Sequence, residues 1–278
     1  MEYFLTELLE YKFIVNALWA ALFASITCGI IGTYIVTNRI VFLSGGITHS
    51  SFGGIGIGYY FGINPIIGAA IFSVLSALGI EFFTQKGQLR NDSVIGIWWS
   101  LGMALGIIFI YITPGYAPNL MTYLFGSILT VSLQDIIFMA TMTFVISLFF
   151  FFFYRLILYV SFDEYYARTH GAPVSLVKNI LISLVALAIV INIKVVGIIL
   201  LISLLTIPQS IANIFTKTFH KMIFYSIAIS LVGVILGLIL SYNLDIPSGA
   251  SIIFALVLLF AVSKLFQTIR KKSYKFNQ

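Results

Sequence analysis

Charged residues are scarce along this 278-residue chain: only 9% are Asp, Glu, Lys or Arg, whereas 60% are apolar. Soluble domains carry roughly 25% charged residues, so the composition excludes a water-soluble core. Proline is also scarce, with 6 residues, and no Pro- or Ser-rich linker, low-complexity tract or charged block divides the chain. The sequence therefore predicts one transmembrane domain, residues 1–278.

Several kinds of chemistry are absent from the sequence as well. The single cysteine, Cys28, lies inside an apolar stretch, so it cannot form a disulfide within the chain. No Gly-x-x-x-x-Gly-Lys-Ser/Thr phosphate loop is present, so the chain cannot hydrolyse ATP by that route. No paired carboxylates and no Ser/His/Asp set fall at a shared membrane depth, which argues against an intramembrane hydrolase. What remains is a transport protein that is not itself an enzyme.

The apolar runs have the length of membrane helices. A spanning helix needs about 20 mostly apolar residues, and alternation of polar and apolar residues, as in a barrel strand, is missing. We therefore predict an all-α, polytopic transmembrane bundle of eight or nine spans, because the second is short and glycine-rich and the seventh closely follows its neighbour. The predicted spans are 13–37, 46–61, 65–84, 93–113, 133–158, 173–193, 195–214, 220–241 and 247–266. The stretch 120–131 is a candidate re-entrant segment.

Basic residues predict the orientation. The net charge is +6, and five of the fifteen basic residues lie in the tail between Lys264 and Lys275. This pattern fits a cytoplasmic membrane surface rather than a nucleic-acid site. Alternating nine spans leaves only Lys12 and Lys194 on the side opposite to the tail. The sequence therefore predicts a cytoplasmic C-terminus and an external N-terminus. The basic residues that share the side of the tail are Arg39, Lys86, Arg90, Arg155, Arg168, Lys178, Lys217 and Lys221.

His49 is the one ionisable residue between Ile40 and Ile80. Ionisable groups at membrane depth are costly and are functional candidates by default. Ten helical residues from Arg39 correspond to about 15 Å, which places His49 near the bilayer midplane. Imidazole binds zinc, iron and related metals, although a histidine that only bonds a neighbouring helix is the alternative.

Two sulfur residues share the predicted depth of His49. Cys28 and Met103 each lie eleven residues from a cytoplasmic charge, Arg39 and Asp92 respectively. Soft ligands in one layer would suit a transition metal. Sequence distance fixes depth but not direction around the helix, so packing is the alternative for both.

A charged segment separates two long spans on the predicted cytoplasmic side. In residues 162–172, Asp163 can cap a short helix, Glu164 falls in its first turn, and Gly171 can end it. The alternative is an ordinary connecting loop. Tyr165 and Arg168 would be exposed on such a helix, so it is a candidate docking element for a partner protein.

Six segments in order resemble a known family. They are 42–49, 92–97, 123–129, 162–171, 196–208 and 241–249, and together they resemble the membrane subunits of bacterial ATP-binding-cassette importers for zinc, manganese and iron, the ABC-3 permeases. The resemblance implies a homodimer in the bacterial cytoplasmic membrane, two cytoplasmic cassette ATPase subunits and an extracytoplasmic metal-binding protein. It assigns segment 163–171 to ATPase coupling and His49 to contact with a transported Zn²⁺, Mn²⁺ or Fe²⁺ ion, with no permanently bound cofactor.

One position departs from the family pattern. Where the pattern commonly has an aspartate four residues before the histidine, this chain has Gly45, so a carboxylate that would help to hold a divalent ion is missing. Asp245 is acidic but falls at the predicted outer mouth, where it would attract or receive cations. Two further hypotheses stay open at this point: transport of a metal chelate such as haem or a siderophore, and a non-transport intramembrane enzyme or scaffold.

Overall fold

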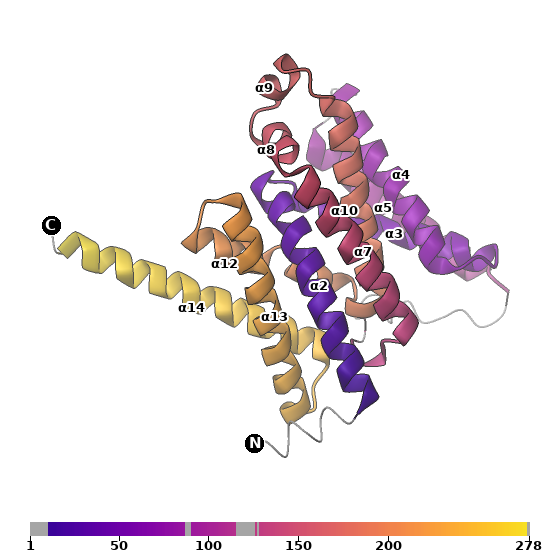
Figure 1. The fold of residues 1–278 in the computed structure, drawn as a ribbon. Helices are drawn as coiled ribbons and strands as arrows, with labels where there is room; N and C mark the ends of the chain where they lie inside the picture. Colours follow the sequence, from indigo (N-terminus) through magenta and orange to yellow (C-terminus); the bar gives the residue numbers. More distant parts are fainter. Residues whose placement is uncertain (1–10, 87–89, 115–125, 127, 277–278) are drawn as a thin grey trace. The chain divides into compact units, whose positions relative to one another are not determined.

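The computed structural model describes residues 11–86, 90–114, 126 and 128–276, and every regular element in those ranges is a helix (Figure 1). Eight of the described spans are long and apolar enough to cross a membrane, which confirms the predicted all-α class. The elements are α2 (Lys12–Thr37), α3 (Val41–Tyr60), α4 (Pro65–Lys86), α5 (Asn91–Ile112), η1 (Ile128–Thr130), α7 (Leu133–Phe152), α8 (Tyr154–Phe162), α9 (Glu164–Thr169), α10 (Val174–Val196), α11 (Ile198–Leu204), α12 (Ile207–Phe215), α13 (Phe219–Leu244) and α14 (Ser248–Phe276).

The helices form two compact units, and neither unit is continuous in sequence. Unit 1 comprises Met1–Val36, Ser127–Thr143 and Ile199–Gln278, and unit 2 comprises Thr37–Gly126 and Phe144–Ile198. A single domain over residues 1–278 stays a prediction.

Helix α3 is the centre of unit 2, where it packs against α4, α5 and α10. Its 20 residues correspond to about 30 Å, enough to cross a bilayer. Nevertheless α3 is not among the eight apolar spans, because it is rich in glycine and serine. Most of its residues are buried by its neighbours, so little of this polar helix needs to face lipid. The choice between eight and nine spans therefore rests on α3.

The glycines of α3 serve close helix packing. A Cβ atom at Gly54 would collide with the backbone of Gly68 in α4, and one at Gly56 would collide with the backbone of Gly106 in α5. Gly53 similarly approaches Phe72 of α4 and the Gly102 carbonyl of α5. These glycines are packing positions, because missing side chains let the backbones of neighbouring helices approach closely.

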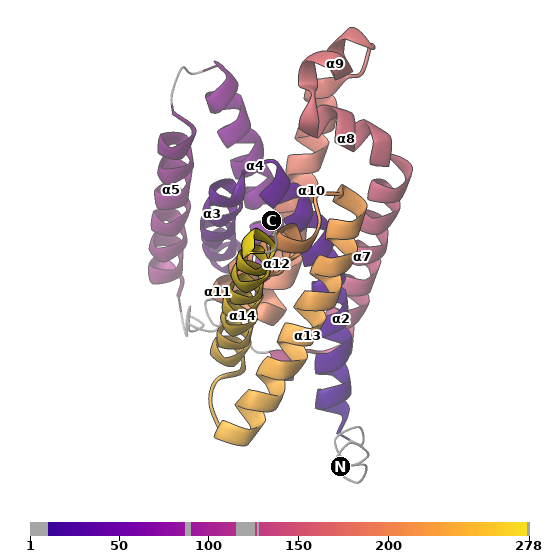
Figure 2. The same cartoon turned by 90° about the vertical axis from the view of Figure 1, so that its left-hand side faces the viewer.

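In unit 1, α13 and α14 form a helical hairpin, and α12 packs against both (Figure 2). Gly233 and Gly237 of α13 leave room for Leu256 and Ile252 of α14. Helix α2 is linked to α7 by a hydrogen bond between the hydroxyls of Thr27 and Thr143, 2.8 Å apart.

The predicted continuous span 195–214 is broken in the structure. Helix α11 ends at Leu204 and α12 begins at Ile207. Pro208 has no backbone N–H, so a helical bond from residue 208 to the Leu204 carbonyl is impossible. The Gln209 side-chain amide donates to that carbonyl instead, at 3.1 Å, and also to the Cys28 carbonyl of α2, at 2.7 Å.

The predicted span 133–158 is also divided. Helix α7 ends at Phe152, and after a turn at Phe153 the chain continues as α8. Twenty residues of α7 already cover about 30 Å, so the stretch that contains Arg155 is not required for the crossing. Of the candidate re-entrant segment 120–131, residues 120–125 and 127 lie outside the described residues, and residues 128–130 form the single turn η1.

Candidate functional site

His49 lies near the middle of α3, as the ninth of its 20 residues, and its side chain is partly buried. Its imidazole stacks on the indole of Trp99 in α5, with ring centroids 4.0 Å apart and ring planes inclined by 7°. Phe42 meets the same indole from one end of α3, with centroids 6.3 Å apart. Stacking on one face therefore holds the imidazole plane and leaves the ring nitrogens at its edge available as ligands.

The Nδ1 atom of His49 is buried and has no hydrogen-bond partner. Buried polar groups are normally paired, so an unpaired ring nitrogen is an exception that suits a transient ligand. The neighbouring hydroxyls are already used: Thr48 donates to the Ser44 carbonyl at 2.7 Å, and Ser51 donates to the Thr48 carbonyl at 2.6 Å. Of the polar side chains from residue 48 to residue 51, His49 is thus the one with a buried polar atom that makes no hydrogen bond.

Gly45 precedes His49 by one helical turn, so the two share a face of α3. A Cβ atom at Gly45 would meet no atom within 4 Å. Packing within unit 2 therefore does not require glycine here, unlike at Gly54. The position could therefore carry a larger side chain.

Met103 follows Trp99 by one turn on the same face of α5. The contacts between α3 and α5 run in parallel, from Gly46 beside Ile95 to Gly56 beside Gly106. Met103 consequently lies about one turn beyond His49 along this interface, and its depth in the membrane stays a prediction. A role for its thioether in metal contact stays a prediction.

Cys28 lies in α2 of unit 1 and is fully buried. Its backbone carbonyl receives the Gln209 amide, so the position serves packing within that unit. A role of its thiol in metal contact stays a prediction. Across the described residues, no three His, Cys, Asp or Glu side chains gather closely enough to hold a metal ion. The described residues therefore do not form a metal cluster of this kind, and metal contact by His49 stays a prediction as well.

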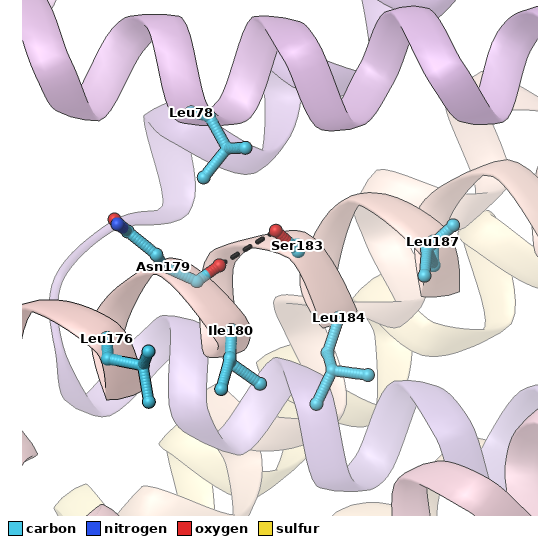
Figure 3. A pocket seen from close by; sticks show the side chains of 7 residues that line it. All are labelled: Leu78, Leu176, Asn179, Ile180, Ser183, Leu184 and Leu187. Carbon is cyan, nitrogen blue, oxygen red and sulfur yellow. Dashed lines mark hydrogen bonds between the residues drawn. The ribbon is translucent and has the colours of Figure 1, made fainter.

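A groove between α4 and α10 offers no metal ligands of that kind (Figure 3). It has a volume of about 320 Å³, and its two polar residues are Asn179 and Ser183. The Ser183 hydroxyl donates to the Asn179 carbonyl at 2.8 Å. The remaining lining residues are Leu78, Leu176, Ile180, Leu184 and Leu187. This surface is apolar and suits contact with lipid, not coordination of an ion.

The charged segment folds as the sequence predicted. Asp163 caps α9, because its carboxylate accepts a hydrogen bond from the Tyr166 amide at 2.8 Å. Gly171 has φ +76°, a left-handed conformation that favours glycine, and its amide donates to the Arg168 carbonyl. Pro173 directly precedes α10. The local sequence thus specifies both ends of this six-residue helix.

Two ion pairs converge on Glu164 at the start of α9. Its carboxylate accepts from Arg168 of the same helix at 2.6 Å and from Lys178 of α10 at 2.5 Å. The hydrogen bond from Lys178, followed by that from Arg168, holds the pKa of Glu164 below its ordinary value. The carboxylate therefore stays ionised at neutral and mildly acidic pH.

The outer surface of α9 presents aromatic and basic groups. Tyr165 is 80% exposed, and the Arg168 side chain is 61% exposed. Large exposed aromatics and arginine are enriched at the centres of protein interfaces. In both Figure 1 and Figure 2, α9 lies at the N-terminal end of α10.

Asp245 follows α13 as an exposed C-cap residue with φ 53° and ψ 46°. Its amide donates to the Ser241 carbonyl, so the residue ends the helix through its backbone. The carboxylate belongs to unit 1 and lies in the turn between α13 and α14.

Sequence reasoning missed two residues that the structure brings to these sites, Trp99 and Lys178. Tryptophan is usual at membrane interfaces, so an indole in the body of a predicted span was an available signal. A lysine five residues inside a predicted span was another, because such a charge requires a partner. Trp98 is not equivalent to Trp99, since its ring packs over Gly79 of α4.

Comparison with known proteins gives one consistent result. Residues 10–267 match the ABC 3 transport family. An uncharacterized membrane protein of Synechocystis sp. is 41% identical over 95% of this chain and 94% of its own length. The manganese transport system membrane protein MntC of Halalkalibacterium halodurans is 32% identical over 96% of this chain and 91% of its own length.

A solved structure agrees with these sequence relatives. PsaBC from Streptococcus pneumoniae, in complex with Fab, has a TM-score of 0.85 and 29% sequence identity, and the match covers 94% of each chain. The fold is therefore that of a multi-pass membrane permease, in agreement with the predicted resemblance. The chain belongs to the ABC 3 transport family of membrane permeases.

Proposed function

We propose that this chain is the permease subunit of an ATP-binding-cassette importer that moves a divalent transition metal ion across the bacterial cytoplasmic membrane. The observation that carries the proposal is the near full-length similarity to a manganese transport system membrane protein. Mn²⁺ is accordingly the first cargo to test, followed by Zn²⁺ and Fe²⁺. The ion is a substrate, and ATP is hydrolysed by a separate subunit.

His49 is the proposed metal contact. Its position in mid-helix, its stacked ring and its unpaired Nδ1 support this role. A neutral imidazole is a suitable ligand for Mn²⁺, Zn²⁺ and Fe²⁺. Because Gly45 supplies no carboxylate, backbone carbonyls, water or a second copy of the chain must complete the coordination.

Helix α9 is the proposed coupling helix. The exposed Tyr165 and Arg168 would contact the cytoplasmic ATPase. Asp163 and Gly171 set the two ends of the helix. Closure of the ATPase on ATP would then move α9, and the permease would switch which face of its pathway is open.

The assembly that follows contains two copies of this chain, two ATPase subunits and an extracytoplasmic metal-binding protein. The positive-inside rule places α9 and the basic end of α14 in the cytoplasm and the N-terminus outside. The turn that carries Asp245 would then face the binding protein, where its negative charge would attract cations.

Ion uptake into proteoliposomes tests the proposal. The chain is reconstituted with its ATPase and binding protein, and ATP-dependent uptake of Mn²⁺, Zn²⁺ and Fe²⁺ is measured. We expect uptake of one ion to fall at least tenfold in His49→Ala. His220→Ala is the matched control, because His220 is exposed at the start of α13.

Each alternative outcome has a defined meaning. Unchanged uptake in His49→Ala would show that His49 is not the metal contact. Uptake of a metal chelate but of no free ion would overturn the proposed cargo. For the coupling helix, Tyr165→Ala combined with Arg168→Ala should reduce co-purification of the ATPase, and unchanged co-purification would contradict the assignment of α9.

A further inference from the structure

The ion pair between Glu164 and Lys178 connects two different helices. Glu164 is the first residue of α9, and Lys178 is the fifth residue of α10. The second partner of Glu164, Arg168, lies on α9 itself and ties the helix only to itself. Lys178 is therefore the residue through which Glu164 fastens α9 to a membrane-spanning helix.

The backbone between these helices is short but contains a possible pivot. Residues 170–173 form the whole connection. Gly171 adopts φ +76°, and a Cβ atom there would meet no atom within 4 Å, so nothing packs against this position. The Ala172 amide donates to the Ala167 carbonyl at 3.0 Å, so a turn of α9 about Gly171 would have to break this one hydrogen bond.

The ion pair closes a loop across this pivot. It joins the first turn of α9, at the end away from the backbone connection, to the second turn of α10, close to that connection. The pair adds a side-chain link at the N-terminal end of α9 to the backbone connection at its C-terminal end, so a tilt of α9 relative to α10 is opposed at both ends. Because a partly exposed pair of this kind contributes little to stability, its main effect is on the angle between the helices.

Helix α10 in turn packs on the helix that carries His49. Val190 of α10 lies in one buried cluster with Ile55 of α3 and Ala69 of α4. Ile55 follows His49 by six residues, or about 9 Å along α3. All of these contacts lie within unit 2. Thus α9 and His49 belong to one set of packed helices, and α10 is the member between them.

We propose that the Glu164–Lys178 ion pair is the joint that transmits movement of α9 to α10, so that Lys178 is a positioning residue for the coupling of ATP hydrolysis to transport. This inference rests on the proposed function, because it requires α9 to be moved by an ATPase. It adds a named joint and a direction of transmission, from α9 through α10 to α3.

The test measures ATP hydrolysis and ion uptake on the same reconstituted complex. Lys178→Met removes the charge and keeps an unbranched side chain, and Glu164→Gln removes the charge of the acceptor. We expect both variants to retain ATP hydrolysis within about twofold, while the number of ions transported per ATP falls at least fivefold. Lys178→Arg, which can pair with Glu164, should keep the number of ions transported per ATP close to that of the wild type.

A matched lysine elsewhere controls for loss of positive charge. Lys221→Met changes an exposed lysine in the first turn of α13, in unit 1, and should leave the ratio unchanged. Equal losses of hydrolysis and uptake in Lys178→Met would overturn the joint, since the pair would then serve assembly. An unchanged number of ions per ATP in Lys178→Met, or a fall in that number in Lys178→Arg, would contradict the proposal as well.

The wild-type complex separates this inference from the proposed function. If the wild type takes up no ion, the proposed function fails before any variant is compared. If the wild type transports and Lys178→Met remains coupled, only the joint fails.

Discussion

Helices α3 and α9 both carry polar residues, but each satisfies them in a different environment. In α3 the hydroxyls turn back to carbonyls of their own helix, and glycines bring the backbones of α4 and α5 close. In α9 a capping carboxylate and two ion pairs perform this function at an exposed surface. A polar helix in the membrane thus depends on its neighbours, whereas a short exposed helix depends on its own ends. This contrast predicts which substitutions each helix tolerates.

The strongest test of the contrast is a methyl group added to α3. Gly54→Ala would drive a Cβ atom into the backbone of Gly68, which cannot move as a side chain can. We expect a loss of about 1–3 kcal/mol in the free energy of unfolding, the usual cost of overpacking. The measurement is reversible unfolding of the purified protein in mixed micelles.

Gly45→Ala is the matched control on the same helix, because its Cβ atom would meet nothing. Alanine is favoured over glycine in a helix interior by roughly 0.5–1 kcal/mol, so stability should hold or rise. Equal losses in both variants would show that the α3 contacts described above do not decide its stability.

The stack of Trp99 on His49 in unit 2 tests the contrast further, because here a neighbouring helix orients the side chain proposed to contact the metal. Trp99→Leu removes the indole from His49, and an aromatic pair contributes about 0.5–1.5 kcal/mol beyond its buried area. The KM for ion uptake should therefore rise roughly 2- to 12-fold. Trp99→Phe keeps an aromatic ring, so its KM should be closer to that of the wild type.

Trp98→Leu controls for the loss of an indole that packs on α4 and not on His49. If Trp98→Leu raises the KM as much as Trp99→Leu does, general packing and not the stack positions His49.

The cap of α9 tests the other half of the contrast. Asp163→Ala removes the acceptor of the Tyr166 amide, a change that typically costs about 0.5–2 kcal/mol of helix stability. Amide hydrogen exchange in residues 164–169 should accelerate, while exchange in α3 stays unchanged. Asp163→Asn retains a capping oxygen and should exchange slowly. Faster exchange in α3 would show that the cap at Asp163 stabilises more than its own helix.

The smallest effect is expected from pH. The folded state lowers the pKa of Glu164, so its stabilising contribution is present above the ordinary carboxyl pKa of 4.5 and is lost as the pH falls through the lower folded value. Between pH 7 and pH 5.5 the ratio of the protection factors of the α9 amides in the wild type and in Glu164→Gln should stay constant. A decline within that interval would show that the carboxylate is not held ionised by Lys178 and Arg168.

Local signals in the sequence predicted much of this molecule. Scarce charge and long apolar runs predicted the all-α membrane fold. In hydrocarbon the backbone N–H and C=O groups of such runs must bond to each other, and a helix pairs them within one segment. The residues of α9 predicted both of its ends, because capping depends on neighbours within four positions.

Tertiary structure decided what depends on contacts distant in sequence. It divided the span 195–214 between Leu204 and Ile207, just before Pro208, where Gln209 replaces the missing donor and reaches Cys28, 181 residues away. It placed the Trp99 indole on His49, and it turned Glu164 toward Lys178. A sequence fixes the depth of a residue along its helix, but the direction in which a side chain points is set by the helices that pack around it. The partners of His49 and Glu164 therefore became visible only in the fold.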